Sequence, residues 1–152
     1  MFNDYTNNTA AGNNSHAEGA KTKASGDYSH AEGNTTQAKK IASHAEGQHT
    51  TAAGIGAHAE GADTQALGDD SHAEGQLTNA TASNSHAEGH LTVASGLNSH
   101  TEGYNTKANK NNSHAEGRIT VANGDASHAE GDETQRPANG RTRRAICLQP
   151  RE

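Results

Sequence analysis

The sequence predicts an all-β fold, a parallel β-roll (solenoid) in which each turn takes fourteen residues and contributes two short strands. Three observations support this prediction. The motif Ser-His-Ala-Glu-Gly starts at residue 15 and returns every fourteen residues, nine times in all, with small edits. Large apolar side chains number twelve of 152, roughly 8%, which is too few for a globular core. A short and strictly kept period is typical of a stacked array, not of a disordered chain.

The chain divides into three regions. Residues 8–12, Asn-Thr-Ala-Ala-Gly, fit the second half of a unit, so residues 1–14 are expected to form an N-terminal partial turn that caps the roll. Residues 15–135 form the nine-repeat roll. Residues 136–152 carry five Arg, one Glu and two Pro, which predicts a basic, disordered tail. Residues 1–135 carry seventeen acidic against seven basic residues, which argues against nucleic acid as a partner.

Positions in the unit are numbered here from its Ser. Positions one to five, residues 15–19 in the first copy, predict the first strand. Side chains alternate between the two faces of a strand, so Ser, Ala and Gly share one face while His and Glu share the other. Because small side chains fit between two closely spaced sheets, we expect the Ser, Ala and Gly face to point inward.

Positions eight to twelve, residues 22–26 in the first copy, predict the second strand. Position eight is Thr in all nine copies, position ten is Ala in eight of them, and position twelve is mostly Gly. These residues share one face, which we expect inside the roll. Positions nine and eleven vary freely and are expected to face solvent. The alternation of side chains along the strand thus places the Thr row inside the roll. An exposed row of Thr would suggest ice binding, and this placement argues against that function.

The His and Glu at positions two and four never change, although they point out of the roll. Residues on a solvent-exposed face usually vary from repeat to repeat. We therefore expect a specific partner to pack on this invariant face. Stacked turns are ~4.8 Å apart, so nine turns make a rod on the order of 45 Å long. The predicted site residues are His16, Glu18, His30, Glu32, His44, Glu46, His58, Glu60, His72, Glu74, His86, Glu88, His100, Glu102, His114, Glu116, His128 and Glu130.

The stretch "HLTVASGLNSHTEGYNTKANKNNSHAEG" resembles the head repeats of YadA-like trimeric adhesins, which have the same fourteen-residue form. The His/Glu version is closest to repeats of phage and Bacillus-group fibre or appendage proteins. The resemblance covers residues 8–135 and implies a left-handed roll assembled as a homotrimer, with positions two and four turned to the threefold axis. In the adhesins those positions are apolar, whereas here they are His and Glu. The adhesins' membrane anchor and the self-cleaving peptidase domain of some relatives are not recognisable in this sequence.

Three His and three Glu would meet in each turn of such a trimer. Buried carboxylates must be paired, and an imidazole can donate to a carboxylate or neutralise it. Pairing is expected to lower the pKa of Glu and to raise the pKa of His. We therefore expect the trimer content to peak between the two pKa values.

Metal binding is the alternative interpretation of the same residues. Rings of imidazoles suit Zn, Ni or Cu, and the candidate ligands on the axis are the nine ladder histidines. However, residues two apart on a strand are ~6.6 Å apart, so one chain's His and Glu are not expected to converge on an ion. We therefore predict no cofactor. The alternative function is a monomeric β-solenoid that binds metal ions or a ligand along an exposed His/Glu face.

We predict a structural fibre or head segment, acting as a spacer and an adhesive surface at a cell surface, outside a cell or on a virion. We predict no enzyme, because nine equivalent pairs on a rod provide no single cleft. Contacts with a host-surface receptor are expected at the variable positions Tyr104, Leu77, Leu91 and Ile119. The sequence contains neither a membrane-spanning stretch nor a secretory signal, so export by lysis or virion assembly is expected. The single Cys147 allows no disulfide within the chain.

Overall fold

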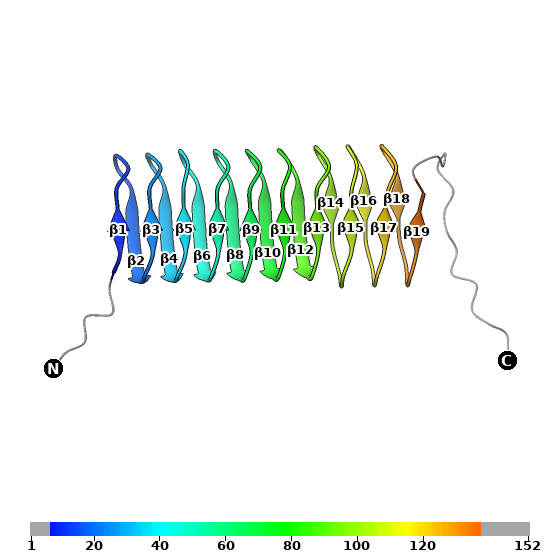
Figure 1. The fold of residues 1–152 in the computed structure, drawn as a ribbon, viewed down its shortest axis with the longest axis horizontal. Helices are drawn as coiled ribbons and strands as arrows, with labels where there is room; N and C mark the ends of the chain where they lie inside the picture. Colours follow the sequence, from blue (N-terminus) through cyan, green and yellow to red (C-terminus); the bar gives the residue numbers. More distant parts are fainter. Residues whose placement is uncertain (1–6, 138–152) are drawn as a thin grey trace, which may run out of the picture.

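The structure, a computed structural model, describes residues 7–137. All its strands are short and parallel, and they stack into two sheets that run along one straight rod (Figure 1). The all-β solenoid predicted from the fourteen-residue period is therefore confirmed. The described residues contain no helix with the length and hydropathy that crossing a bilayer requires.

The first sheet contains nine strands and the second contains ten. The strands of the first sheet are β2 (His16–Ala20), β4 (His30–Asn34), β6 (His44–Gln48), β8 (His58–Ala62), β10 (His72–Gln76), β12 (His86–His90), β14 (His100–Thr101), β16 (His114–Ala115) and β18 (His128–Ala129). Those of the second sheet are β1 (Thr9–Ala10), β3 (Lys23–Ala24), β5 (Gln37–Ala38), β7 (Thr51–Ala52), β9 (Gln65–Ala66), β11 (Asn79–Ala80), β13 (Val93–Ala94), β15 (Lys107–Ala108), β17 (Val121–Ala122) and β19 (Gln135–Arg136).

Every strand pairs with the strand one turn away in a register that places identical positions side by side. In β10 and β12, for example, His72 is opposite His86 and Glu74 is opposite Glu88. A one-residue slip would turn the small face of the strand outward, so the alternating pattern fixes this register. All nine copies of the motif therefore form continuous rows along the rod.

The described roll begins with β1 and ends with β19. β1 pairs with β3, so the partial turn at residues 8–12 contributes a strand to the second sheet. Arg136 lies in β19 rather than in the tail and pairs with Ala122. Residues 1–6 and residues 138–152, which include Cys147 and most of the predicted tail, lie outside the described residues.

The interior consists of small side chains from both sheets. Ala at positions three and ten is fully buried in all but the end turns, and Thr at position eight and Ser at position one are buried beside it. The predicted inward direction of the Thr row is confirmed. Such a core buries little apolar area for each residue, because Ala contributes few methylene groups. Much of the order must therefore come from the backbone ladders between turns.

The glycine at position five differs from its predicted place. It is exposed rather than inside, because its φ lies between +100° and +109° and the strand no longer alternates there. A Cβ at Gly75 would lie 2.2 Å from the carbonyl oxygen of Gly89 in the next turn. Both the left-handed backbone and this close approach exclude any side chain, which explains why position five never changes.

The two corners of each turn are formed by residues in the left-handed helical region. Positions seven and fourteen have φ between +52° and +63°, and most of these residues are not glycine. Their amides point back along the rod: the N–H of Leu77 donates to the carbonyl of Ala62 at 2.9 Å, whereas strand residues such as His72 donate forward to Ser85. The corners thus bend the chain without leaving these backbone donors unpaired.

The serine at position one closes the corner before the first strand. The hydroxyl of Ser71 donates to the carbonyl oxygen of Gly68 at 2.6 Å, and the N–H of Ser71 donates to the same oxygen at 3.3 Å. The hydroxyl bond recurs in all eight serine copies at 2.5–2.7 Å. A buried hydroxyl needs such a partner, so serine suits this position for a local structural reason.

Candidate functional site

The candidate site is the double row of His and Glu side chains on the outer face of the first sheet, called the His/Glu ladder below. The strands of that sheet bring the predicted residues together, one His and one Glu in each turn. In the inner rungs the paired side chains are 31–38% exposed, whereas His16 and Glu18 in the first rung are 65% and 58% exposed. The ladder is thus a half-buried surface of a single chain.

The imidazole rings form a continuous stack. From His30 to His128, neighbouring ring centroids are 4.7–4.8 Å apart and their planes differ by no more than 18°. The ring of His16 is tilted by 52° against His30 at 5.2 Å. The rod of Figure 1 is straight. Untwisted sheets of many strands are unusual and are typically stabilised by side-chain ladders of this kind.

Each imidazole approaches a carboxylate with its Nε2 atom. In the first six turns the partner is the Glu of the same turn, with Nε2 to Oε2 distances of 3.3–3.9 Å. The ends of one chain's His and Glu side chains thus lie closer together than the ~6.6 Å between their backbone positions. The two side chains lean toward each other along the strand, so their ends meet although their backbone positions are two residues apart.

The pairing changes partner at Glu88. In the last three turns each His approaches the Glu of the preceding turn, as in His128 with Glu116 at 3.1 Å. Glu88 lies 3.9 Å from His86 and 4.0 Å from His100, so it belongs to both patterns. The change falls next to Thr101, where Thr replaces the usual Ala at position three.

The carboxylates at this change affect one another's protonation. The pKa of Glu88 is raised, first by desolvation and then by the neighbouring carboxylates of Glu102 and Glu74. The pKa of Glu102 is lowered by hydrogen bonds with Glu116 and Glu88. At the exposed end of the ladder, the hydrogen bond from His16 lowers the pKa of Glu18, which is the predicted direction for a paired glutamate.

In the single chain, the net pKa shift of three histidines is downward, opposite to the rise expected for pairing in the trimer. The pKa values of His44, His72 and His100 are lowered, first by desolvation and then by the histidines stacked on either side. The glutamates raise these values, but by less. In a stack with rings 4.8 Å apart, a positive charge on one ring disfavours a positive charge on the next. The sequence-based prediction considered only the attraction between one His and one Glu.

Seven ladder Nε2 atoms lie out of contact with solvent and have no hydrogen-bond partner among residues 7–137. Their nearest carboxylate oxygens are 3.4–4.0 Å away, beyond normal hydrogen-bond length. The seven belong to His30, His44, His58, His72, His86, His100 and His114. Such atoms cost free energy unless another partner reaches them.

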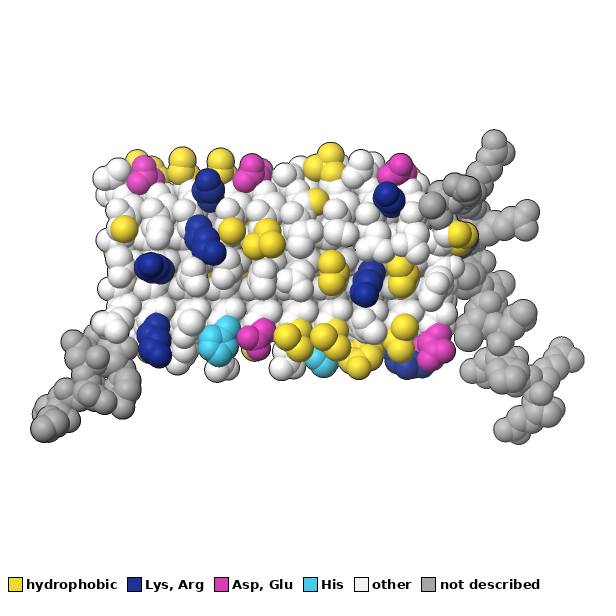
Figure 2. Space-filling model, in the orientation of Figure 1, with side chains coloured by type: hydrophobic (Ala, Val, Ile, Leu, Met, Phe, Trp, Pro, Cys, Tyr) yellow, Lys and Arg dark blue, Asp and Glu magenta, His cyan; other side chains and the backbone are white. Residues whose placement is uncertain are grey.

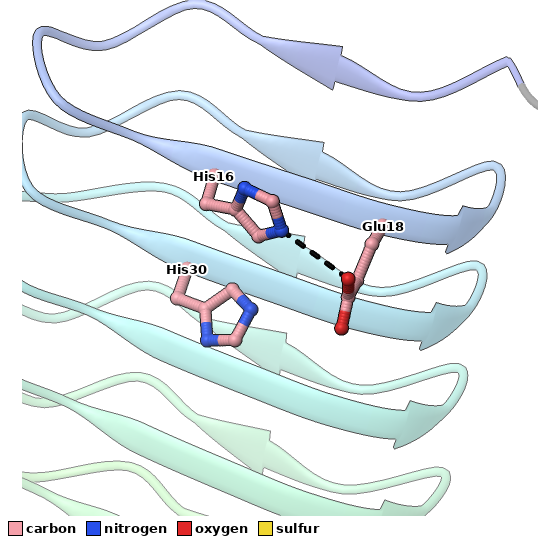
Figure 3. Close-up of side chains that lie close together, drawn as sticks. All are labelled: His16, Glu18 and His30. Carbon is pink, nitrogen blue, oxygen red and sulfur yellow. Dashed lines mark hydrogen bonds and ion pairs between the residues drawn. The ribbon is translucent and has the colours of Figure 1, made fainter.

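Groups of two histidines and one glutamate recur along the ladder with their donor atoms within 4.8 Å of one another. Figure 3 shows the first group, in which both imidazoles and the carboxylate of Glu18 point toward a common space. Five of the six groups are His16, Glu18 and His30; His44, Glu46 and His58; His58, Glu60 and His72; His72, Glu74 and His86; and His114, Glu116 and His128. Imidazole and carboxylate groups are ligands that divalent transition metals accept.

The face shown in Figure 2 is of a different kind. Basic, acidic and hydrophobic side chains are scattered over it, and hydrophobic ones appear at its upper edge, in its middle and at its lower edge. Of the predicted receptor positions, Leu77, Leu91 and Tyr104 are exposed and Ile119 is partly exposed. Side-chain identity varies at these positions, whereas it is constant on the ladder.

Some contacts on the corners are not evident from the sequence. Nδ1 of His49 lies 3.4 Å from a carboxylate oxygen of Asp63 in the next turn. His90 ends strand β12 and meets the ring of Tyr104 edge-on at 5.4 Å. The left-handed corner residues were also missed. The Asn, Asp or Gly at position fourteen in six of the nine copies is the signal that could have revealed one of the two corners.

Comparisons with known proteins give no relative: no protein-family model matches the chain, and no curated protein matches it. The fold and the site alone define its class. The chain is a β-solenoid repeat protein with a His/Glu ladder along one face.

Proposed function

We propose that the chain is a structural segment of a fibre, in which three copies meet along their His/Glu ladders around a common axis. The observation that supports this most directly is the row of seven Nε2 atoms without a hydrogen-bond partner in the described chain. A neighbouring ladder offers carboxylates at the same spacing. Because these Nε2 atoms are out of contact with solvent in the single chain, each imidazole would have to rotate toward the neighbouring ladder to complete a hydrogen bond across the interface.

The shape of the rod favours the same assembly. A straight, untwisted face can meet two others over its whole length, whereas a twisted one separates after a few turns. The interior of Ala, Thr, Ser and Gly buries little apolar area, so burial of the half-exposed ladder would add stability that one thin rod lacks. The resemblance to trimeric adhesin heads implies the same arrangement.

The biological role that fits is a spacer, with adhesion on the variable surface. A rod of identical turns sets a distance between its two ends. The side chains of Leu77, Leu91 and Tyr104 would be available for a host-surface receptor, because they are exposed. A place on a virion, on a cell surface or outside a cell suits such a rod, and no catalytic step is part of the proposal.

The second candidate is a single-chain solenoid that binds metal along an exposed ladder, which the His–Glu–His groups favour. Sedimentation velocity on the full chain separates the two. The fibre proposal requires a species of three chains, whereas a single chain at all concentrations supports the second candidate.

A charge-reversal pair sharpens this test. The double change Glu60→Lys and Glu74→Lys places positive charge on the ladder and should dissociate the trimer. The control is Gln65→Lys with Asn79→Lys at position nine on the other sheet, where Lys23 and Lys107 occur naturally. The control should remain three chains. Dissociation by the control, or an intact trimer in the ladder variant, would contradict the proposed interface.

A further inference from the structure

In the seven inner rungs whose Nε2 atoms have no hydrogen-bond partner in the described chain, the distances between imidazole and carboxylate are longer than those of hydrogen bonds. Nε2 and Oε2 are 3.6 Å apart in His44 and Glu46, 3.5 Å in His58 and Glu60, and 3.4 Å in His72 and Glu74. A normal N–H···O bond is 2.7–3.2 Å long. In a tetrahedral site with bonds of about 2.0–2.1 Å, however, two ligand atoms are about 3.3–3.5 Å apart. The ladder spacing thus resembles the edge of a metal coordination shell.

A third ligand comes from the neighbouring turn. The donor atoms of His44, Glu46 and His58 all lie within 4.8 Å of one another. Parallel stacked rings direct their lone pairs along parallel lines, so one ring must tilt before both can reach one ion. His16 and His30 already show such a tilt of 52°, and Figure 3 shows their rings directed toward Glu18.

We propose that neighbouring rungs of the ladder bind divalent transition-metal ions, with Zn²⁺ as the best match, through two imidazole Nε2 atoms and one carboxylate oxygen. Three protein ligands of this type plus one water complete a tetrahedral zinc shell. The ion would supply the missing partner of the otherwise unpaired Nε2 atoms. The inference uses atoms of one chain only. It rests on the second candidate function and names its metal and ligands, and zinc would compete with a neighbouring ladder for the same Nε2 atoms.

The sharing of histidines limits the number of ions. His58 belongs to the group with Glu46 and also to the group with Glu60, so neighbouring groups compete for it. Nine ladder histidines taken in pairs allow no more than about four ions for each chain. Zinc should therefore bind in alternate gaps of the ladder.

The direct test is zinc titration of the full chain, prepared without a polyhistidine tag and freed of metal with a chelator. Calorimetry should show up to about four ions bound to each chain, and Co²⁺ in place of zinc should give the visible spectrum of tetrahedral coordination. No zinc binding, or a purely octahedral Co²⁺ spectrum, would overturn the proposal.

Variants test which residues bind the metal. The triple change Glu46→Gln, Glu60→Gln and Glu74→Gln keeps side-chain size but removes the carboxylates, and should weaken zinc binding in these turns at least about tenfold, the loss that outer-shell changes alone cause. The control is His49→Asn with His90→Asn, two histidines outside the ladder, and should bind as the parent does. Equal affinity in the triple variant, or a loss in the control, would contradict the assignment.

A milder variant covers the case in which the triple change disturbs the fold. His58→Gln removes the imidazole that two groups share and should lower the stoichiometry by about one ion for each chain. Unchanged stoichiometry would contradict the ladder site. Sedimentation of the same samples, with and without zinc, records assembly separately, so failure of metal binding and failure of the trimer are distinguishable.

Discussion

Ala57 is the single residue at position one that lacks a hydroxyl group. Its N–H donates to the carbonyl of Gly54 at 3.4 Å, the longest of the nine equivalent bonds, and the second bond to that oxygen is missing. The corner before β8 is therefore held less tightly than the others.

The change Ala57→Ser should restore this bond. One added intramolecular hydrogen bond contributes about 0.5–1.5 kcal/mol to the free energy of unfolding, so the melting temperature should rise. The mirror change Ser71→Ala removes the 2.6 Å bond to Gly68 and should lower the stability by a similar amount. Thermal unfolding followed by circular dichroism measures both. A destabilising Ala57→Ser would show that the serine is kept for another reason.

The sequence predicts correctly which residues are buried where burial depends on side-chain size and strand alternation. The burial of Thr78 and Ala80 follows from strand alternation alone. The exposed place of Gly75 does not, because it depends on a positive φ and on the carbonyl of Gly89 nearby. The sequence alone does not distinguish a glycine that is required for its small size in the interior from one that is required for a positive φ.

The stacked histidines set the acid stability of the first sheet. Desolvation and the stacked neighbours lower the pKa of His44, His72 and His100, although the adjacent glutamates oppose them. A lowered pKa means that the folded chain holds fewer protons than the unfolded chain. Stability is thus fully present above the unfolded value near 6.5, and it is lost as the pH falls through the folded values.

The melting temperature should therefore drop between pH 7.5 and pH 5.5, before most carboxylates take up protons. The raised pKa of Glu88 has the opposite effect on the pH dependence of stability. It is a single group, whereas three histidines have a lowered pKa. Scanning calorimetry at several pH values measures the effect. A variant with His44→Gln, His72→Gln and His100→Gln should lose most of the pH dependence in this range. A melting temperature that is constant over the range in the parent chain would contradict the assignment.

The two strands of each turn were predictable, but the pairing along the ladder was not. Alternation places His86 and Glu88 on one outer face. Which carboxylate each imidazole approaches depends on small tilts of the side chains, and the change of partner at Glu88 has no sequence signal apart from the nearby Thr101. The direction of the histidine pKa shift in the single chain does not follow from one His–Glu pair, because it depends on the neighbouring rungs.

At the scale of the whole molecule, the fourteen-residue unit is the smallest part that can be removed cleanly. Deletion of residues 57–70 joins Gly56 to Ser71 and leaves every remaining residue in its own row. The shortened chain should fold, and its rod should be shorter by ~4.8 Å, as small-angle X-ray scattering can measure. Deletion of residues 57–63 is the matched control. It joins Gly56 to Thr64, which places second-strand residues where the first strand should be, and it should not fold. Equal folding of both deletions would show that the register is not fixed by the repeat.

The constant register also has a consequence for how such a gene changes. The interior and ladder positions carry nearly the same residues in every turn. Gain or loss of fourteen codons through unequal recombination therefore needs no compensating substitution in another turn. Selection can therefore change the length of the rod in steps of one turn, while the residues of the His/Glu ladder stay the same in each turn.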